Sequence, residues 1–175
     1  RVEEGYDVSF GDWSAAFSGR SSIVEEGNVS FGSVADENAY NSILIGENAS
    51  VKIGAATIQD ITNKGKLTLS GSLKVSKDLR NEGIIDIAAT TLSVKKNYSG
   101  TGTIKSAGGT FKREEITDDN NTYEATINRL DATSITITGT KDNIISISNP
   151  VKVEKITAAF VELIDGVYGD ITGND

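Results

Sequence analysis

The chain has 175 residues, which is enough for one domain with a substantial hydrophobic core. Its 17 Lys and Arg residues against 25 Asp and Glu residues give a net charge of −8, which argues against nucleic-acid binding and against docking on an anionic membrane. Cys and His are both absent, so disulfides, thiolate chemistry and the usual general base and transition-metal ligand are excluded.

Short apolar–polar–apolar stretches recur along residues 1–111 at a nearly constant interval. Six successive units are 21, 22, 16, 18 and 19 residues apart, and a second set of apolar positions repeats every 19 residues. This alternation indicates short β-strands with one buried face, and the Gly and Asn residues between them indicate turns. The first set consists of Val8, Val29, Val51, Leu67, Ile85 and Ile104, and the second of Leu73, Leu92 and Phe111.

The repeat predicts an all-β fold. Strands this short cannot bury enough surface as isolated hairpins, whereas stacked coils place like residues above one another. We therefore predict a parallel β-helix, a solenoid with coils of 18–22 residues. The alternative is an antiparallel β-sandwich, whose strands recur at about half this period. The helix is favoured because each repeat contains two strands and because Asn-x-Gly recurs in phase at 63–65 and 81–83.

The repeat breaks at the charged, turn-rich stretch KREEITDDNNTY. We expect solenoid coils over residues 1–111, a protruding loop or inserted hairpin over 112–124, and further coils with a C-terminal cap over 125–175. These parts are expected to form a single domain. The loop is the predicted contact surface, with Lys112, Arg113, Asp118, Asp119 and Tyr123 as its contact residues.

The segment 153–167 near the C-terminus is ambiguous. Its apolar residues lie close to helical spacing, which would suit a short amphipathic helix that caps the stack. Two further strands, Ala158–Ile164 and Val167–Ile171, would explain the same residues. Both interpretations remain open from the sequence.

Two acidic segments are weak candidates for calcium, which takes six to eight oxygen ligands. One contains Asp118 and Asp119, and the other contains Asp165 and Asp170 among glycines. The first lacks the alternating Asp-x-Asp spacing of a calcium loop, and the second does not match the calcium-binding nonapeptide repeat. Solvated turns therefore explain both segments more simply, and no other cofactor is expected.

No catalytic residue is predicted. Asp86 lies between Ile85 and Ile87 and should point outward if those two residues point into the core. A carboxylate pair for acid–base chemistry needs a second carboxylate at a defined separation, and the repeat pattern places none opposite Asp86.

Residues 63–111, which begin NKGKLTLSGSLKVSKDLRNEGIIDI, resemble the repeats of bacterial autotransporter passengers and related large surface adhesins. The similarity lies in Asn-x-Gly-x-Leu-x-Leu followed by Gly-Thr-Ile. It implies a right-handed parallel β-helix on the bacterial cell surface, and it carries over no catalytic residue.

These observations lead us to expect an extracellular, non-catalytic structural or adhesive module of a bacterial cell-surface protein. Its expected partners are a host or cell-surface protein or glycan, or another copy of the chain, with no nucleic acid and no transmembrane segment. Two alternatives are a carbohydrate lyase or hydrolase built on a β-helix and a self-assembling lattice protein of the surface-layer type, in which calcium could take part.

Overall fold

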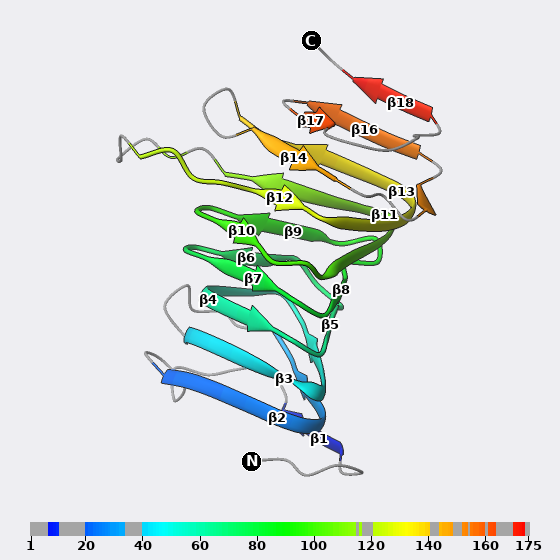
Figure 1. Cartoon of the computed structure of the whole chain (residues 1–175). Helices are drawn as coiled ribbons and strands as arrows, with labels where there is room; N and C mark the ends of the chain where they lie inside the picture. Colours follow the sequence, from blue (N-terminus) through cyan, green and yellow to red (C-terminus); the bar gives the residue numbers. More distant parts are fainter. Residues whose placement is uncertain are drawn as a thin grey trace.

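The computed structural model describes residues 7–10, 20–33, 40–114, 116, 121–140, 144–148, 152–153, 155–159, 161–163 and 170–173. These residues form β-strands stacked as a solenoid of about six turns, with β1 and β18 at opposite ends (Figure 1). Neighbouring coils pair in parallel, for example β5 with β8 and β8 with β11. The predicted parallel β-solenoid is therefore confirmed, and the antiparallel sandwich is wrong.

The described strands vary in length from two residues to fourteen. In chain order they are β1 (Asp7–Phe10), β2 (Arg20–Phe31), β3 (Tyr40–Ile53), β4 (Ala56–Asn63), β5 (Lys66–Leu69), β6 (Leu73–Val75), β7 (Leu79–Asn81), β8 (Ile84–Asp86), β9 (Thr91–Val94), β10 (Tyr98–Ser99), β11 (Thr103–Arg113), β12 (Thr126–Ile127), β13 (Arg129–Thr138), β14 (Ile145–Ile147), β15 (Lys152–Val153), β16 (Lys155–Ala159), β17 (Val161–Leu163) and β18 (Asp170–Gly173).

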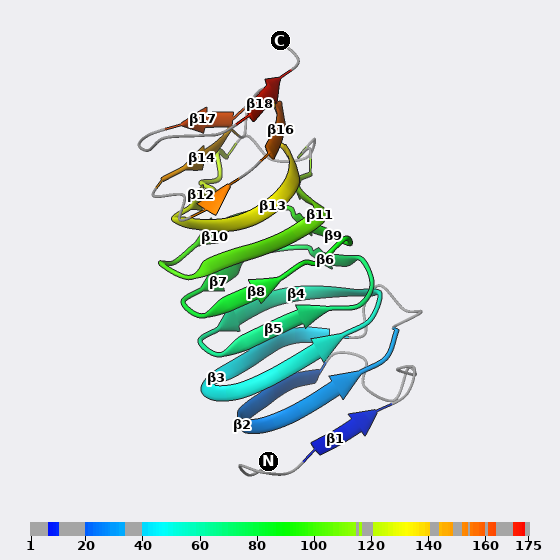
Figure 2. The same cartoon turned by 90° about the vertical axis from the view of Figure 1, so that its right-hand side faces the viewer.

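The longest strands bend around the corners of the stack, as β3, β11 and β13 show in Figure 2. β3 pairs with β4 along its first part and with β5 along its last part, and β11 pairs in the same way with β8 and β9. This bending joins 15 strands into one continuous sheet. β12, β14 and β17 form a separate three-stranded sheet, which a bridge between Tyr98 and Ala125 places next to β10.

The apolar repeat of the sequence is the coil of the structure. Each residue of the first apolar set pairs with the next one, in the order Val8, Val29, Val51, Leu67, Ile85 and Ile104. Leu73, Leu92 and Phe111 pair in the same way. From Val29 onward these residues are buried. The core is therefore a set of aliphatic columns that run along the stack, one residue per coil.

The Asn-x-Gly turns combine a buried amide with a close backbone approach. Asn63 and Asn81 are both fully buried, and Asn63 Nδ2 donates a hydrogen bond of 2.8 Å to Asn81 Oδ1. A Cβ atom added at Gly83 would overlap the carbonyl oxygen of Gly65 in the coil below. The recurring pair is thus an inward asparagine followed by a turn where only glycine fits.

The described residues of the ambiguous segment near the C-terminus form strands, so of the two open interpretations the strands are correct and the cap helix is wrong. β16 pairs with β13, and Ile156 is fully buried in register with Ile135. β17 pairs with β14, so that Val161 aligns with Ile145. The apolar residues meet the columns of the preceding coils, and this stacking decides their conformation in place of the helical periodicity.

Candidate functional site at the widened coil

One connection of the solenoid is much longer than its equivalents. Residues 76–78 join β6 to β7, and residues 95–97 join β9 to β10 in the next coil. In the coil after that, the eleven residues 114–124 join Arg113 to Ala125, which is the residue that bridges to Tyr98. We call residues 114–124 the inserted segment, and its described parts run outward from the stack in Figure 1. The ladders on both sides continue, since β11 pairs with both β9 and β13.

A buried arginine lies at the base of the inserted segment. Arg113 is in register with Val94, which pairs in turn with Val75, so a cation occupies a column that holds valine in the two coils below. The Arg113 side chain is 1% exposed, and its Nη1 and Nη2 donate 3.4 Å hydrogen bonds to the carbonyl oxygens of Glu124 and Tyr123. Burial lowers the pKa of Arg113 to about 10, an effect that the charge of Asp78 opposes. The guanidinium thus joins the two ends of the inserted segment.

Side-chain amides and carboxylates form a column along the same corner. Asp60 Oδ1 accepts a 3.3 Å hydrogen bond from the backbone N–H of Asp78. Asp78 Oδ1 accepts bonds of 3.0 Å from both the backbone N–H and the Nδ2 of Asn97. Asn97 Oδ1 then accepts a 3.0 Å bond from the N–H of Glu124. The side chains of the regular coils therefore fix the end of the inserted segment where it returns to the stack.

A rigid aromatic pair supports this corner from inside. Tyr98 is buried, and its ring packs edge-on against Phe111 with the ring centroids 5.1 Å apart. Its hydroxyl accepts a 3.2 Å hydrogen bond from Asn81 Nδ2, and its backbone N–H donates to the Glu124 carbonyl at 3.0 Å. Burial raises the pKa of Tyr98 above the ordinary value of 10.0. The hydroxyl therefore stays protonated in the core.

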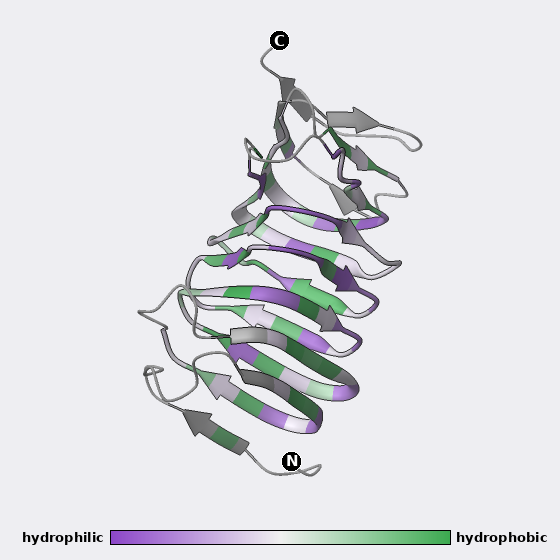
Figure 3. Cartoon of the chain, turned by 90° about the vertical axis from the view of Figure 1, so that its left-hand side faces the viewer, coloured by the Kyte–Doolittle hydropathy of each residue, from purple (hydrophilic) through white to green (hydrophobic). Residues whose placement is uncertain are grey.

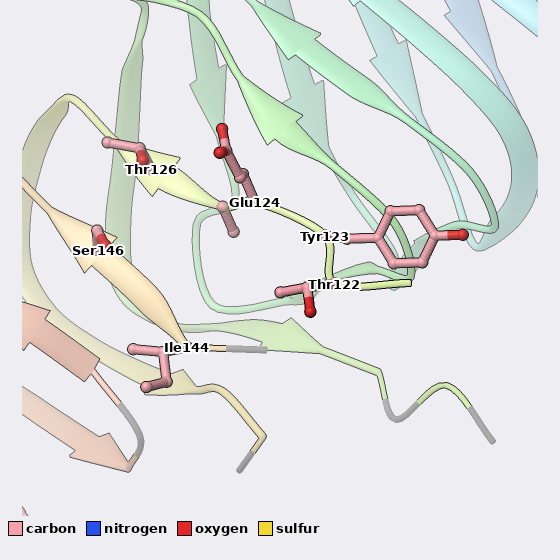
Figure 4. A pocket seen from close by; sticks show the side chains of 7 residues that line it. Thr122, Tyr123, Glu124, Thr126, Ile144 and Ser146 are labelled. Carbon is pink, nitrogen blue, oxygen red and sulfur yellow. The ribbon is translucent and has the colours of Figure 1, made fainter. Parts of the chain in front are cut away.

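A pocket of about 390 Å³ opens where the inserted segment returns to the stack (Figure 4). Thr126 and Ser146 form one wall, because they are aligned on β12 and β14. Ile144 is 51% exposed beside them, and the Tyr123 ring projects away from it. Hydroxyls, a carboxylate and exposed apolar surface suit a polar ligand with an apolar face, such as a sugar. The full lining is Thr122, Tyr123, Glu124, Ala125, Thr126, Ile144 and Ser146.

The predicted contact residues lie in different environments. β11 extends to Arg113, so residues 112 and 113 belong to the sheet and not to the predicted loop. Lys112 is exposed, whereas the Arg113 side chain is buried and presents no contact surface, which corrects that prediction. Arg113 is buried because it is in register with Val94, whose side chain lies in the core. Tyr123 is half-buried in the inserted segment, with its ring centroid 5.3 Å from Lys96 Nζ.

The predicted calcium residues receive no structural support. Asp118, Asp119 and Asp165 lie outside the described residues. Asp170 begins β18, where its backbone pairs with Lys155, and its side chain also lies outside what is described. Within the described ranges, no group of three or more acidic side chains could hold a metal ion.

Several residues of the site carried no recognisable signal in the sequence. Thr126 and Ser146 were part of an ordinary strand alternation, and Lys96 was one lysine among many. Ile144 precedes Ile145, and two adjacent apolar residues in a strand pattern place one of them outward. That doubling was the single available hint that an apolar side chain is exposed here.

The chain matches no family model, no curated protein and no solved structure in the comparisons that we made. The stacked coils are compatible with a β-helical repeat protein and do not identify an autotransporter or an adhesin. Among the described residues there is no helix with the length and apolar character needed to cross a bilayer.

Proposed function

We propose that this chain is a non-catalytic structural and adhesive module of a bacterial cell-surface protein, in which a stiff solenoid presents the inserted segment and its pocket to a partner. The partner is a protein or glycan of a host or neighbouring cell. The solenoid supplies length and stiffness, and the widened coil supplies the contact.

The observation that carries this proposal is the widened coil itself. An eleven-residue connection replaces a three-residue one without interrupting the ladders on either side. Arg113 and Asn97 hold its returning end by hydrogen bonds, so it is anchored on a rigid base. Contact surfaces are often loops positioned by a scaffold in this way. The buried cation is costly to place in a core, and the described hydrogen bonds of its side chain go to the backbone of the inserted segment.

A designed deletion tests the proposal. The inserted segment is replaced by Ser-Lys-Asp, the sequence of residues 76–78, and Arg113→Val restores the valine found in the coils below. Because the regular coils close with such a connection, we expect this loopless variant to fold with the β-sheet circular dichroism of the parent. It should lose binding to fixed epithelial cells and to bacterial cells displaying the parent chain.

A matched control separates loss of contact from loss of fold. Thr122→Ala together with Tyr123→Ala keeps the length of the inserted segment and changes two residues of the pocket lining. We expect this variant to melt like the parent and to bind cells several-fold more weakly. If the loopless variant folds and binds cells as strongly as the parent, the inserted segment is not the contact surface.

A further inference from the structure

Five lysines gather at the corner below the inserted segment, although the chain as a whole is acidic. Lys96 N–H donates to the Lys77 carbonyl at 3.0 Å, so these two residues occupy equivalent places in adjacent coils. On the adjacent strands, Lys74 of the coil below and Lys112 of the coil above are both in register with Ser93. We call Lys74, Lys77, Lys95, Lys96 and Lys112 the lysine ridge. In Figure 3 the turns of the middle coils on this side of the molecule are coloured as hydrophilic.

Glu114 pairs with one lysine of the ridge and is close to two others in register. Glu114 Oε2 is 3.1 Å from Lys74 Nζ. The Glu114 N–H donates to the Val94 carbonyl, which places Glu114 beside Lys95 of the coil below. Lys112 precedes Glu114 by two residues on the same side of β11, because the buried Arg113 between them faces inward. Glu114 therefore occupies a place where an anionic group meets several cations at once.

The charge of the ridge is only partly compensated among the described residues, where Asp60 and Asp78 lie along the same corner. Lys74 pairs with Glu114, and Lys96 lies over the ring of Tyr123. Within the described residues, Lys77, Lys95 and Lys112 form no ion pair. Like charges on neighbouring coils repel one another, and an anion bound between them would relieve that repulsion. At roughly 4.8 Å per rung, Lys77 and Lys96 are one rung apart and Lys74 and Lys112 are two rungs apart, so the lysines follow the stack over three coils.

We propose that the lysine ridge binds a linear anionic polysaccharide, one that carries carboxylate or sulfate groups along its chain. Lysines repeated from coil to coil complement a chain whose charges recur at about the length of one sugar residue. Tyr123 adds an aromatic face next to Lys96, and such faces stack on sugar rings. Glu114 already pairs with Lys74, and an anionic group of the polysaccharide joins or displaces it.

A membrane surface or a nucleic-acid duplex, each wider than a single polysaccharide chain, fits this surface less well. The lysine ridge is bordered by Glu114 and Glu124 at the two ends of the inserted segment and by Asp60 and Asp78 along the same corner. A membrane or a nucleic-acid duplex would approach these carboxylates and the ridge together, within a Debye length of about 8 Å. A single flexible chain can follow the ridge and avoid them. Binding of a membrane or of a nucleic acid is therefore an outcome that the experiment below must exclude.

Calorimetric titration with a heparin-derived oligosaccharide and with an oligogalacturonate tests the proposal, since the first carries sulfate and carboxylate and the second carboxylate alone. We expect at least one to bind, and its affinity to fall steeply between about 20 mM and about 500 mM salt because screening shortens the range of charge interactions. The ridge variant Lys95→Gln/Lys96→Gln/Lys112→Gln should bind about tenfold more weakly, the combined effect of three exposed ion contacts.

The control variant removes the same charge elsewhere. Lys52, Lys64 and Lys66 are exposed outside the ridge, and their joint replacement by glutamine should change the affinity less than twofold. Glu114→Gln should tighten binding several-fold, because it removes the internal anion from among Lys74, Lys95 and Lys112. Lysines that act only as solubilising residues would give neither result.

Three results would overturn the proposal. These are no binding of either oligosaccharide at low salt, equal loss in the ridge and control variants, and tighter ridge-dependent binding of single-stranded DNA or of phosphatidylserine vesicles. The inference goes beyond the proposed adhesive contact and can fail separately from it. The loopless variant keeps Lys95, Lys96 and Lys112, so it should still bind the oligosaccharide after losing attachment to cells.

Discussion

Replacing Asn81 with alanine removes a buried side chain that connects three coils. Asn81 Oδ1 accepts the 2.8 Å hydrogen bond from Asn63 Nδ2 in the coil below. Its own Nδ2 donates to the Tyr98 hydroxyl at 3.2 Å and to the Thr103 carbonyl at 3.3 Å in the coil above. The side chain is fully buried, so water cannot replace these partners. The substitution therefore breaks three bonds in the middle of the stack.

The expected loss of stability is about 3 kcal/mol, from three buried hydrogen bonds at about 1 kcal/mol each. Asn63 Nδ2 keeps its 3.1 Å bond to the Ile84 carbonyl, which limits the damage on the lower side. On the upper side, the Tyr98 hydroxyl and the Thr103 carbonyl each lose a donor. In a Tyr98→Phe background the same substitution should cost about 1 kcal/mol less, because one of the three bonds is already absent.

Urea unfolding followed by circular dichroism measures this loss as a lower midpoint with an unchanged slope. Arg80→Ala is the control, since the neighbouring Arg80 side chain is 64% exposed and pairs with Glu82 on the surface. Its expected cost is below about 1 kcal/mol, as for other exposed ion pairs. If Asn81→Ala cost no more than Arg80→Ala, the buried amides would not hold the coils together, and the reasoning would be refuted.

Two further predictions concern the turns and the buried tyrosine. Gly83→Ala should lower the melting temperature strongly and cost more than about 2 kcal/mol, because its Cβ would overlap the Gly65 carbonyl, whereas Lys64→Ala on the exposed turn should melt like the parent. An unchanged melt for Gly83→Ala would contradict that close approach. Because burial raises the pKa of Tyr98 above 10.0, the unfolded chain loses this proton first as the pH rises. The folding free energy should therefore weaken above pH 10 by up to about 1.4 kcal/mol per pH unit from this group. Tyr98→Phe should remove that part of the alkaline loss in urea titrations at pH 9 to 11, and equal losses in both proteins would contradict it.

The sequence by itself determined the coil and its core. Alternation of apolar and polar residues fixes which face of each strand is buried, and a one-residue slip would turn the whole apolar set outward. For this reason Leu67, Ile85 and Ile104 could be aligned in advance, and they are Cα partners in the structure. The break after residue 111 was visible for the same reason, since the charged run departs from the alternation of apolar and polar residues.

Only the tertiary structure decided the role of the residues at that break. Arg113 belongs to a charged run and was expected at the surface, yet its place in the column of Val94 turns it inward. Lys74 and Glu114 form an ion pair although 40 residues separate them in the chain. The segment 153–167 has helical spacing, but its residues 155–159 form a strand, because β16 pairs with β13. Local pattern specifies which face of a strand is apolar, whereas the column a residue enters depends on the coils above and below it, and these are brought together only by the stacking of the whole chain.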